Sequence, residues 1–252
     1  MCPARSGPDL ESCQPLVALG ETWQRQWIMP HADTAIRSAG VTRGLLRCGA
    51  AAGPLFVATF LVEGAARVDY DPRRHPVSSL ALGPRGTVQV ANFLVAGALY
   101  TGYAVGLARV RSGSQGRLGP ILVGAAGAGL VGAGVFRTDP VSGYPPGTPD
   151  RPTGYTRLGR LHDVVSVPTF LGIPAASFVY ARAFVHDGRP AWALYSAASG
   201  GTMLATVVAA SAGFGQARKF VGVAGLFQRI SVTAGFGWLT ALAIRGLADL
   251  RP

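Results

Sequence analysis

Six runs without a charged residue constrain the fold of this 252-residue chain more than any other feature. They cover residues 48–62, 86–108, 118–136, 164–181, 190–217 and 230–244, and their lengths range from 15 to 28 residues. A helix needs about 20 mainly apolar residues to cross a bilayer, and fewer where long side chains at its ends reach the headgroups. The runs therefore predict membrane-spanning segments.

The same runs predict helices and not barrel strands. Strands of a membrane barrel alternate apolar and polar residues over about 10 positions, and these runs show no alternation. A helix also satisfies its own backbone hydrogen bonds in lipid. We therefore expect an all-α polytopic membrane protein, a compact bundle of six transmembrane helices. The expected helices lie at roughly 45–63, 87–108, 119–136, 162–181, 191–213 and 227–245.

The two shorter runs depend on the residues that bound them. Arg47 and Glu63 flank the first run, and Arg229 and Arg245 flank the last. Long charged side chains can extend along a helix to the polar edge of the membrane, which lengthens the segment that can be buried. We expect these four residues to lie at the membrane surfaces.

Composition supports a lipid bilayer as the partner of the chain. Hydrophobic residues make up 49% of it and charged residues only 14%, whereas soluble domains carry about 25% charged residues. The net charge of +11 comes from arginines between the apolar runs. This placement is typical of membrane-flanking anchors and does not predict nucleic-acid binding. Cys2, Cys13 and Cys48 form no CxxC motif and predict no disulfide framework.

The chain divides into three parts in this interpretation. Residues 1–43 mix Pro, Arg, Glu, Asp and Gln without an apolar run, and we expect a mostly disordered cytoplasmic leader. Residues 44–246 form the six-helix transmembrane domain, and residues 247–252 are a short tail.

Loop charges favour one orientation. The short loops at 109–117 and 182–189 concentrate arginines, and basic loops face the cytoplasm. Both termini are then cytoplasmic, in a cell (plasma) membrane protein.

Polar residues gather in the segments expected on the outer face. One loop carries His75 and Ser79, the next carries Asp139, and His162 begins the fourth helix. We expect Asp139 and His162 to lie close together, with Ser79 or His75 as a third member. Asp139 also precedes a proline, and an Asp-Pro pair forms turns without any chemical role.

These motifs resemble a known family. A Ser-x-Leu pattern occurs before the second helix, where Ser78 or Ser79 precedes Leu80 and Leu82. Phe-Arg-Thr-Asp-Pro follows the third helix, and Leu-His begins the fourth. The pattern resembles the bacterial membrane family known as domain of unknown function 998, over about residues 44–246. The resemblance implies a multi-pass membrane protein, marks Ser79, Asp139 and His162, and implies no activity.

Two functional alternatives stay open. His75, Asp139 and His162 could hold zinc, whose bound water would serve a membrane hydrolase acting on a lipid or amide, although no HExxH spacing occurs. Ser79, Asp139 and His162 are then the candidate catalytic residues. A small-molecule or lipid transporter is the other alternative, since Pro168 and Pro174 could break the fourth helix.

One motif resembles a nucleotide site and is rejected. Gly127, Gly129 and Gly132 spell GxGxxG, but that fingerprint opens a helix after a strand. Here it lies inside an apolar run, so we expect no nucleotide cofactor. The sequence leaves the oligomeric state and the question of enzymatic activity open.

Overall fold

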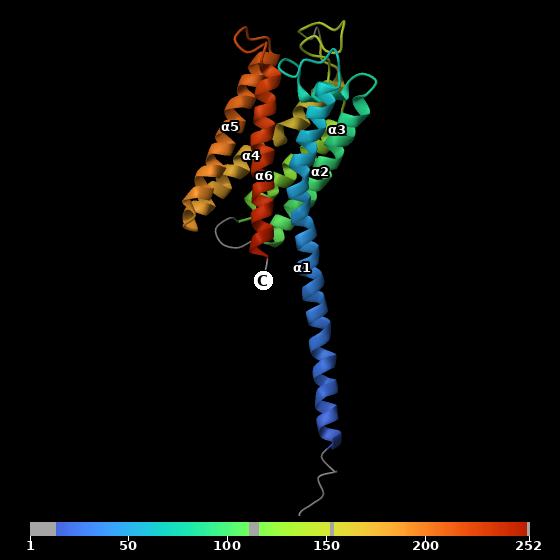
Figure 1. Ribbon diagram of the computed structural model, residues 1–252, viewed down its shortest axis with the longest axis vertical. Coiled ribbons are helices and arrows are strands. Elements are labelled where there is room, and N and C mark those ends of the chain that lie inside the picture. Colours follow the sequence, from blue (N-terminus) through green and yellow to red (C-terminus); the bar gives the residue numbers. More distant parts are fainter. Residues whose placement is uncertain (1–13, 111–115, 152–153, 251–252) are drawn as a thin grey trace, which may run out of the picture. The chain divides into compact units, whose positions relative to one another are not determined.

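The computed structural model describes residues 14–110, 116–151 and 154–250 (Figure 1). The described residues form six α-helices and one short 3-10 helix. These are α1 (Gln14–Ala65), η2 (Val77–Ala81), α2 (Gly86–Arg109), α3 (Leu118–Val135), α4 (Arg157–His186), α5 (Pro190–Phe214) and α6 (Ala224–Asp249).

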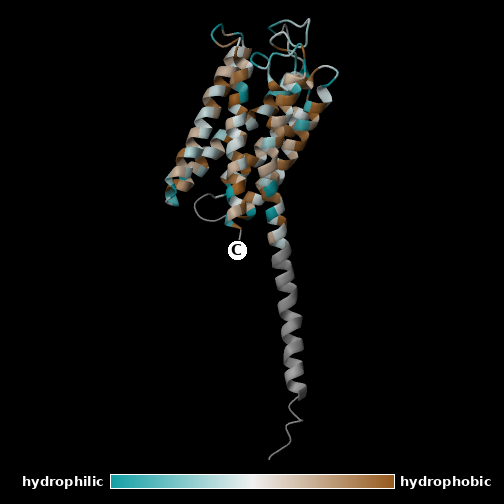
Figure 2. Ribbon diagram, in the orientation of Figure 1, coloured by the Kyte–Doolittle hydropathy of each residue, from teal (hydrophilic) through white to brown (hydrophobic). Residues whose placement is uncertain are grey.

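The predicted fold class is confirmed. Six helices, with Ser38–Ala65 as the spanning part of α1, are long and apolar enough to cross a membrane. The protein is therefore an all-α, multi-pass membrane protein. Helices α2 to α6 extend one to five residues past most predicted ends, because flanking polar residues continue a helix beyond its charge-free run. Figure 2 shows apolar residues along these helices and polar residues mainly near their ends.

Helix α1 differs from the expected leader. It begins at Gln14, so residues 14–43, expected to be disordered, are helical, while residues 1–13 lie outside the described residues. Adding residues to an existing helix avoids the cost of nucleating a new one, and the apolar span at Ser38–Ala65 supplies that helix. Met1–Val41 and Thr42–Pro252 are separate units by their contacts.

Within Thr42–Pro252, helices that follow one another in the chain pack side by side from α2 to α6. Helix α1 closes the arrangement. The ring of Phe56 on α1 lies 5.1 Å from that of Phe236 on α6, and the amide nitrogen of Asn92 on α2 donates to the Phe56 carbonyl oxygen at 3.1 Å. The six helices thus surround a common interior.

Glycines bring neighbouring helices into close contact. A Cβ on Gly97 of α2 would lie 2.7 Å from the Gly127 carbonyl oxygen of α3, and one on Gly129 would lie 2.7 Å from the Val165 carbonyl oxygen of α4. Apolar burial does not drive helices together in lipid, so such close backbone packing contributes much of their association. Gly127 and Gly129, part of the GxGxxG pattern, are packing residues inside α3.

Candidate functional site

The two long loops, at 66–85 and 136–156, pack against each other at one end of the bundle. The Nη1 atom of Arg67 donates to the Tyr144 hydroxyl at 3.1 Å, and Arg74 pairs with Asp150 at 2.7 Å. The rings of Tyr70 and Tyr144 meet edge to face, 5.2 Å apart. The prediction that these loops share one side of the bundle is confirmed, and we call this side the loop end.

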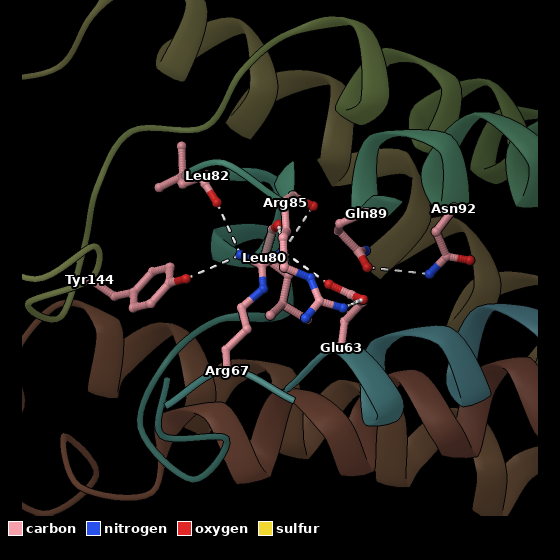
Figure 3. A network of polar contacts seen from close by, with 8 residues as sticks. All are labelled: Glu63, Arg67, Leu80, Leu82, Arg85, Gln89, Asn92 and Tyr144. Carbon is pink, nitrogen blue, oxygen red and sulfur yellow. Dashed lines mark hydrogen bonds and ion pairs between the residues drawn. The ribbon is translucent and has the colours of Figure 1, made fainter. Parts of the chain in front are cut away.

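Arg67 organises the first loop (Figure 3). Its Nη2 donates to the carbonyl oxygens of Leu80 and Arg85 at 2.7 and 3.0 Å, and its Nη1 donates to that of Leu82 at 3.0 Å. Its Nη2 also pairs with the Glu63 carboxylate at 3.2 Å, and Arg85 contacts the other Glu63 oxygen at 2.6 Å. One planar guanidinium thus holds η2 and the start of α2 against the end of α1.

Arg229 of α6 holds the other side of the same loop. Its Nη1 donates to the His75 carbonyl oxygen at 3.0 Å, and its Nη2 donates to the Tyr70 hydroxyl. The Tyr70 hydroxyl in turn donates a hydrogen bond to the Pro76 carbonyl oxygen at 2.8 Å. Burial raises the pKa of Tyr70 to about 12, although Arg229 opposes this. Tyr70 therefore stays neutral and acts as a hydrogen-bonding link between the loop and α6.

The sequence interpretation of Glu63 and Arg229 was wrong. Both were expected to extend to the membrane surface, but their exposed fractions are only 5% and 7%. Each finds its partners inside the loop end. Because the loop folds back over the bundle, it supplies carbonyl oxygens and arginines that no charge-free run could reveal.

His75 has a structural role in this loop. The backbone amide of Asp71 donates to its Nδ1 at 2.9 Å, and its ring is 5.3 Å from that of Tyr144. Burial lowers the pKa of His75 below its ordinary value of 6.5. A ring nitrogen that accepts a hydrogen bond carries no proton, so His75 is a neutral member of the loop core.

Ser79 is also part of this core. It is fully buried within η2, and within the described part of the chain its hydroxyl has no hydrogen-bond partner. On α2, the side-chain oxygen of Gln89 accepts a hydrogen bond from the side-chain amide of Asn92 at 3.3 Å (Figure 3). Asn92 also donates to a carbonyl oxygen of α1. Both bonds are typical of polar residues that join neighbouring membrane helices by hydrogen bonds.

Asp139 anchors the beginning of α4. Its carboxylate accepts hydrogen bonds from the backbone amide and the hydroxyl of Thr156, at 2.8 and 2.7 Å. Thr156 is the N-cap residue, and its hydroxyl oxygen accepts from the Gly159 amide at 2.9 Å. A Cβ on Gly159 would overlap the Asp139 carboxylate, so glycine is required for this close approach.

His162 closes the end of α3. Its Nδ1 lies 3.1 Å from the Ala133 carbonyl oxygen and 2.9 Å from that of Phe136. Both partners are acceptors, so Nδ1 carries the hydrogen and donates it. The final carbonyls of a helix lack partners within it, and His162 supplies one from α4. Its side chain is only 4% exposed.

Asp139 and His162 share a cavity of about 670 Å³ at the loop end. Its polar lining comprises Ser78, Thr138, Asp139, Tyr155, His162, Asp163, Ser166, Thr169, Ser211 and Gln228. All six helices contribute apolar lining, including Phe56, Phe93, Leu130, Val167, Leu204 and Val232. The cavity therefore occupies the interior that the six helices surround.

The cavity opens between α4 and α5. Val167 and Leu171 of α4 and Leu204 and Val208 of α5 line it, yet these four side chains are 37–62% exposed. All four lie inside segments apolar enough to span the membrane. The cavity is thus open on the side of α4 and α5, within their spanning segments. Tyr155, Asp163, Ser211 and Gly215 also line it and are exposed, so it is open nearer the loop end as well.

The expected polar cluster forms only in part. Asp139 and His162 line the same cavity, but no hydrogen bond or ion pair joins them within the described part of the chain. Ser79 and His75 lie in the loop core, where the chain folds over the bundle. No group of three or more His, Cys, Asp or Glu side chains able to hold a metal occurs among the residues described. The zinc hydrolase stays a prediction.

Helix α4 bears on the transporter alternative. It continues without a break from Arg157 to His186, with Pro168 and Pro174 inside it. Proline removes a backbone donor and leaves a carbonyl free. The Ser177 hydroxyl donates to the carbonyl oxygen of Pro174 itself at 2.7 Å, whereas the carbonyls that lose a donor are those of Val164 and Phe170, four residues before each proline. The helix keeps its course despite these losses. The predicted break at the prolines is therefore not formed.

Comparison with known proteins identifies a family. Residues 50–245 match the model of a family described as "Protein of unknown function (DUF998)". No curated protein and no solved structure matches the chain. The matched region covers the helices that surround the cavity and both loops of the loop end. The chain therefore belongs to the DUF998 family of multi-pass membrane proteins.

Proposed function

We propose that this protein binds a lipid-like amphiphile, which enters the cavity from the bilayer between α4 and α5, and transfers it between the membrane and the loop end. The lateral opening carries this proposal. Exposed apolar side chains at a cavity mouth within a spanning segment suit a ligand dissolved in lipid.

The depth of the opening supports a lipid source. Val167 and Leu171 follow the first residue of α4, Arg157, by ten and fourteen positions. A rise of 1.5 Å per residue places them about 15–21 Å along the helix. The hydrocarbon core of a bilayer is about 30 Å thick, so an acyl chain could pass there without crossing headgroups.

The composition of the cavity suits an amphiphile. Its volume of about 670 Å³ falls within the range of about 300–1,000 Å³ found for small-molecule sites. Apolar residues from six helices can hold a chain. Asp139 and His162, at the loop end of the cavity, can hold a polar head.

Blocking the opening tests the proposal. Val167→Trp would fill the mouth of the cavity, and Val164→Trp is the matched control. Val164 lies on the same helix, is 66% exposed and is not part of the lining. Native mass spectrometry of purified protein titrated with tetradecanol should show about one bound alcohol for the wild type and the control, and none for Val167→Trp. Equal binding by all three proteins would overturn the proposal.

We further propose that the protein lies in the plasma membrane with the loop end outside and both termini in the cytoplasm. The opposite end of the bundle has two short connections. Arg109 and Arg117 flank the one between α2 and α3, and Arg182 and Arg189 lie near the one between α4 and α5. Arginines in short loops favour the cytoplasmic side.

Cysteine labelling tests this orientation. In a chain with all three native cysteines replaced by serine, Pro146→Cys at the loop end and His186→Cys at the opposite end would both be exposed. An impermeant thiol reagent added to intact cells should label position 146 and spare position 186. Labelling of position 186 alone would reverse the orientation.

A further inference from the structure

The charge of the cavity is opposite to that of the chain. The protein has a formal net charge of +11, yet no Arg or Lys is among the described residues that line the cavity. The lining instead contains the carboxylates of Asp139 and Asp163. An anionic head would meet negative charge there without a cation to compensate it.

His162 adds a hydrogen-bond acceptor to this lining. Its Nδ1 donates to the two carbonyl oxygens at the end of α3, and the tautomer that makes these bonds leaves Nε2 as an acceptor. No hydrogen bond to Nε2 arises within the described part of the chain. A side chain that is 96% buried thus lines the cavity with an unpartnered acceptor, and such atoms are satisfied by a ligand or water.

The other polar groups of α4 are already engaged. The Ser166 hydroxyl donates to the His162 carbonyl oxygen at 2.7 Å, and the Thr169 hydroxyl donates to the Ala126 carbonyl oxygen at 3.0 Å. Asp163 accepts no hydrogen bond from the described residues and is exposed. The groups that α4 leaves for a ligand are therefore an imidazole acceptor and a carboxylate.

We propose that the cavity selects an amphiphile whose head donates hydrogen bonds, an amine or a hydroxyl, and rejects anionic lipids. This inference rests on the proposed function and names its ligand class. The head would lie between His162 Nε2 and the carboxylates of Asp139 and Asp163, and its chain would extend toward the opening at Val167 and Val208. The Gln228 side chain lies on the α6 side of the cavity. Its amide nitrogen can donate a hydrogen bond to the oxygen of a hydroxyl head.

Three probes with the same chain length test the choice of head. Tetradecylamine, tetradecanol and myristate are titrated against the purified protein, with Val167→Trp as the control for adsorption to the micelle. We expect the amine to bind about tenfold more tightly than the acid because of its charge, with the alcohol between them. Binding of myristate as tight as that of the amine would overturn this inference and leave the proposed function intact. Binding of none of the three would overturn both.

Variants of Asp163 test the role of the lining charge without disturbing the fold, since this side chain is exposed and forms no hydrogen bond with the described residues. Asp163→Asn should reduce the preference for the amine over the acid about threefold or more. Asp163→Lys should reverse it. The control is Asp249→Asn, because Asp249 lies at the far end of α6 and should leave the preference unchanged. An unchanged preference in Asp163→Lys would contradict the inference.

Discussion

Asp139 and Thr156 are joined by two hydrogen bonds, from the backbone amide and the hydroxyl of Thr156 to the two carboxylate oxygens of Asp139. This pair links the loop after α3 to the first turn of α4. Asp139 and His162, one turn further along α4, both line the cavity. The carboxylate therefore combines a capping role with a position in the candidate site.

Loss of this pair should destabilise the start of α4. Thr156→Val removes the N-cap hydroxyl and should lower the free energy of unfolding by about 1 kcal/mol. Asp139→Asn should have a similar effect. The double variant should lose less than the sum of the two, because residues in one hydrogen-bond network are coupled. Unfolding in mixed micelles measures the cycle, and strictly additive losses would show that the pair does not act as a unit.

Arg67 should be the residue of the loop end least tolerant of a conservative change. Arg67→Lys keeps the charge but cannot reach the carbonyl oxygens of Leu80, Leu82 and Arg85 together. Leu80 and Leu82 are buried, and leaving two such acceptors without partners costs about 1–3 kcal/mol each, so the free energy of unfolding should fall by at least about 2 kcal/mol. The control is Arg73→Lys at an exposed position. Equal unfolding free energies for the two variants would contradict the role given to Arg67.

The stability of the loop end should depend on pH through His75. Its folded pKa lies below 6.5, so the unfolded chain binds a proton more readily than the folded protein. Stability should therefore be complete above pH 6.5 and fall as the pH decreases below that value. Thermal unfolding between about pH 5 and pH 8 measures this fall.

His75→Asn serves as the control for this titration. Its side-chain oxygen can accept the Asp71 amide in place of Nδ1, and it carries no titratable group. The variant should lose the part of the pH dependence that begins near 6.5. The same decline in wild type and variant would assign the effect to another residue.

The six helices could be predicted from the sequence because each satisfies its own backbone in lipid and so depends on local composition alone. The cavity could be predicted in part. Asp139 and His162 follow and begin consecutive helices, so chain connectivity brings them to one end. Arg67 and Arg229 could not be recognised, since a buried arginine and a membrane-flanking arginine have the same local sequence context. Their partners are backbone carbonyls of a loop whose path depends on the complete fold.

The opening between α4 and α5 could not be predicted from the sequence either. Val167 and Val208 belong to apolar runs in which nearly every residue could face lipid. What distinguishes them is that they line the cavity while their side chains stay exposed, and no local pattern encodes which lipid-facing side chains border a cavity. Even so, the glycines that set close helix contacts, such as Gly97 and Gly129, could be seen in the sequence.

Photocrosslinking in the membrane tests the central claim, entry of an amphiphile between α4 and α5, most directly. The probe is tetradecanol with a diazirine at the end of its chain, and the labelled peptides are mapped with and without excess unlabelled tetradecanol. We predict that label suppressed by the competitor lies around Val167, Leu171, Leu204 and Val208, whose side chains form the opening. Label spread evenly over lipid-facing residues such as Ile121 of α3, and unaffected by the competitor, would contradict the account.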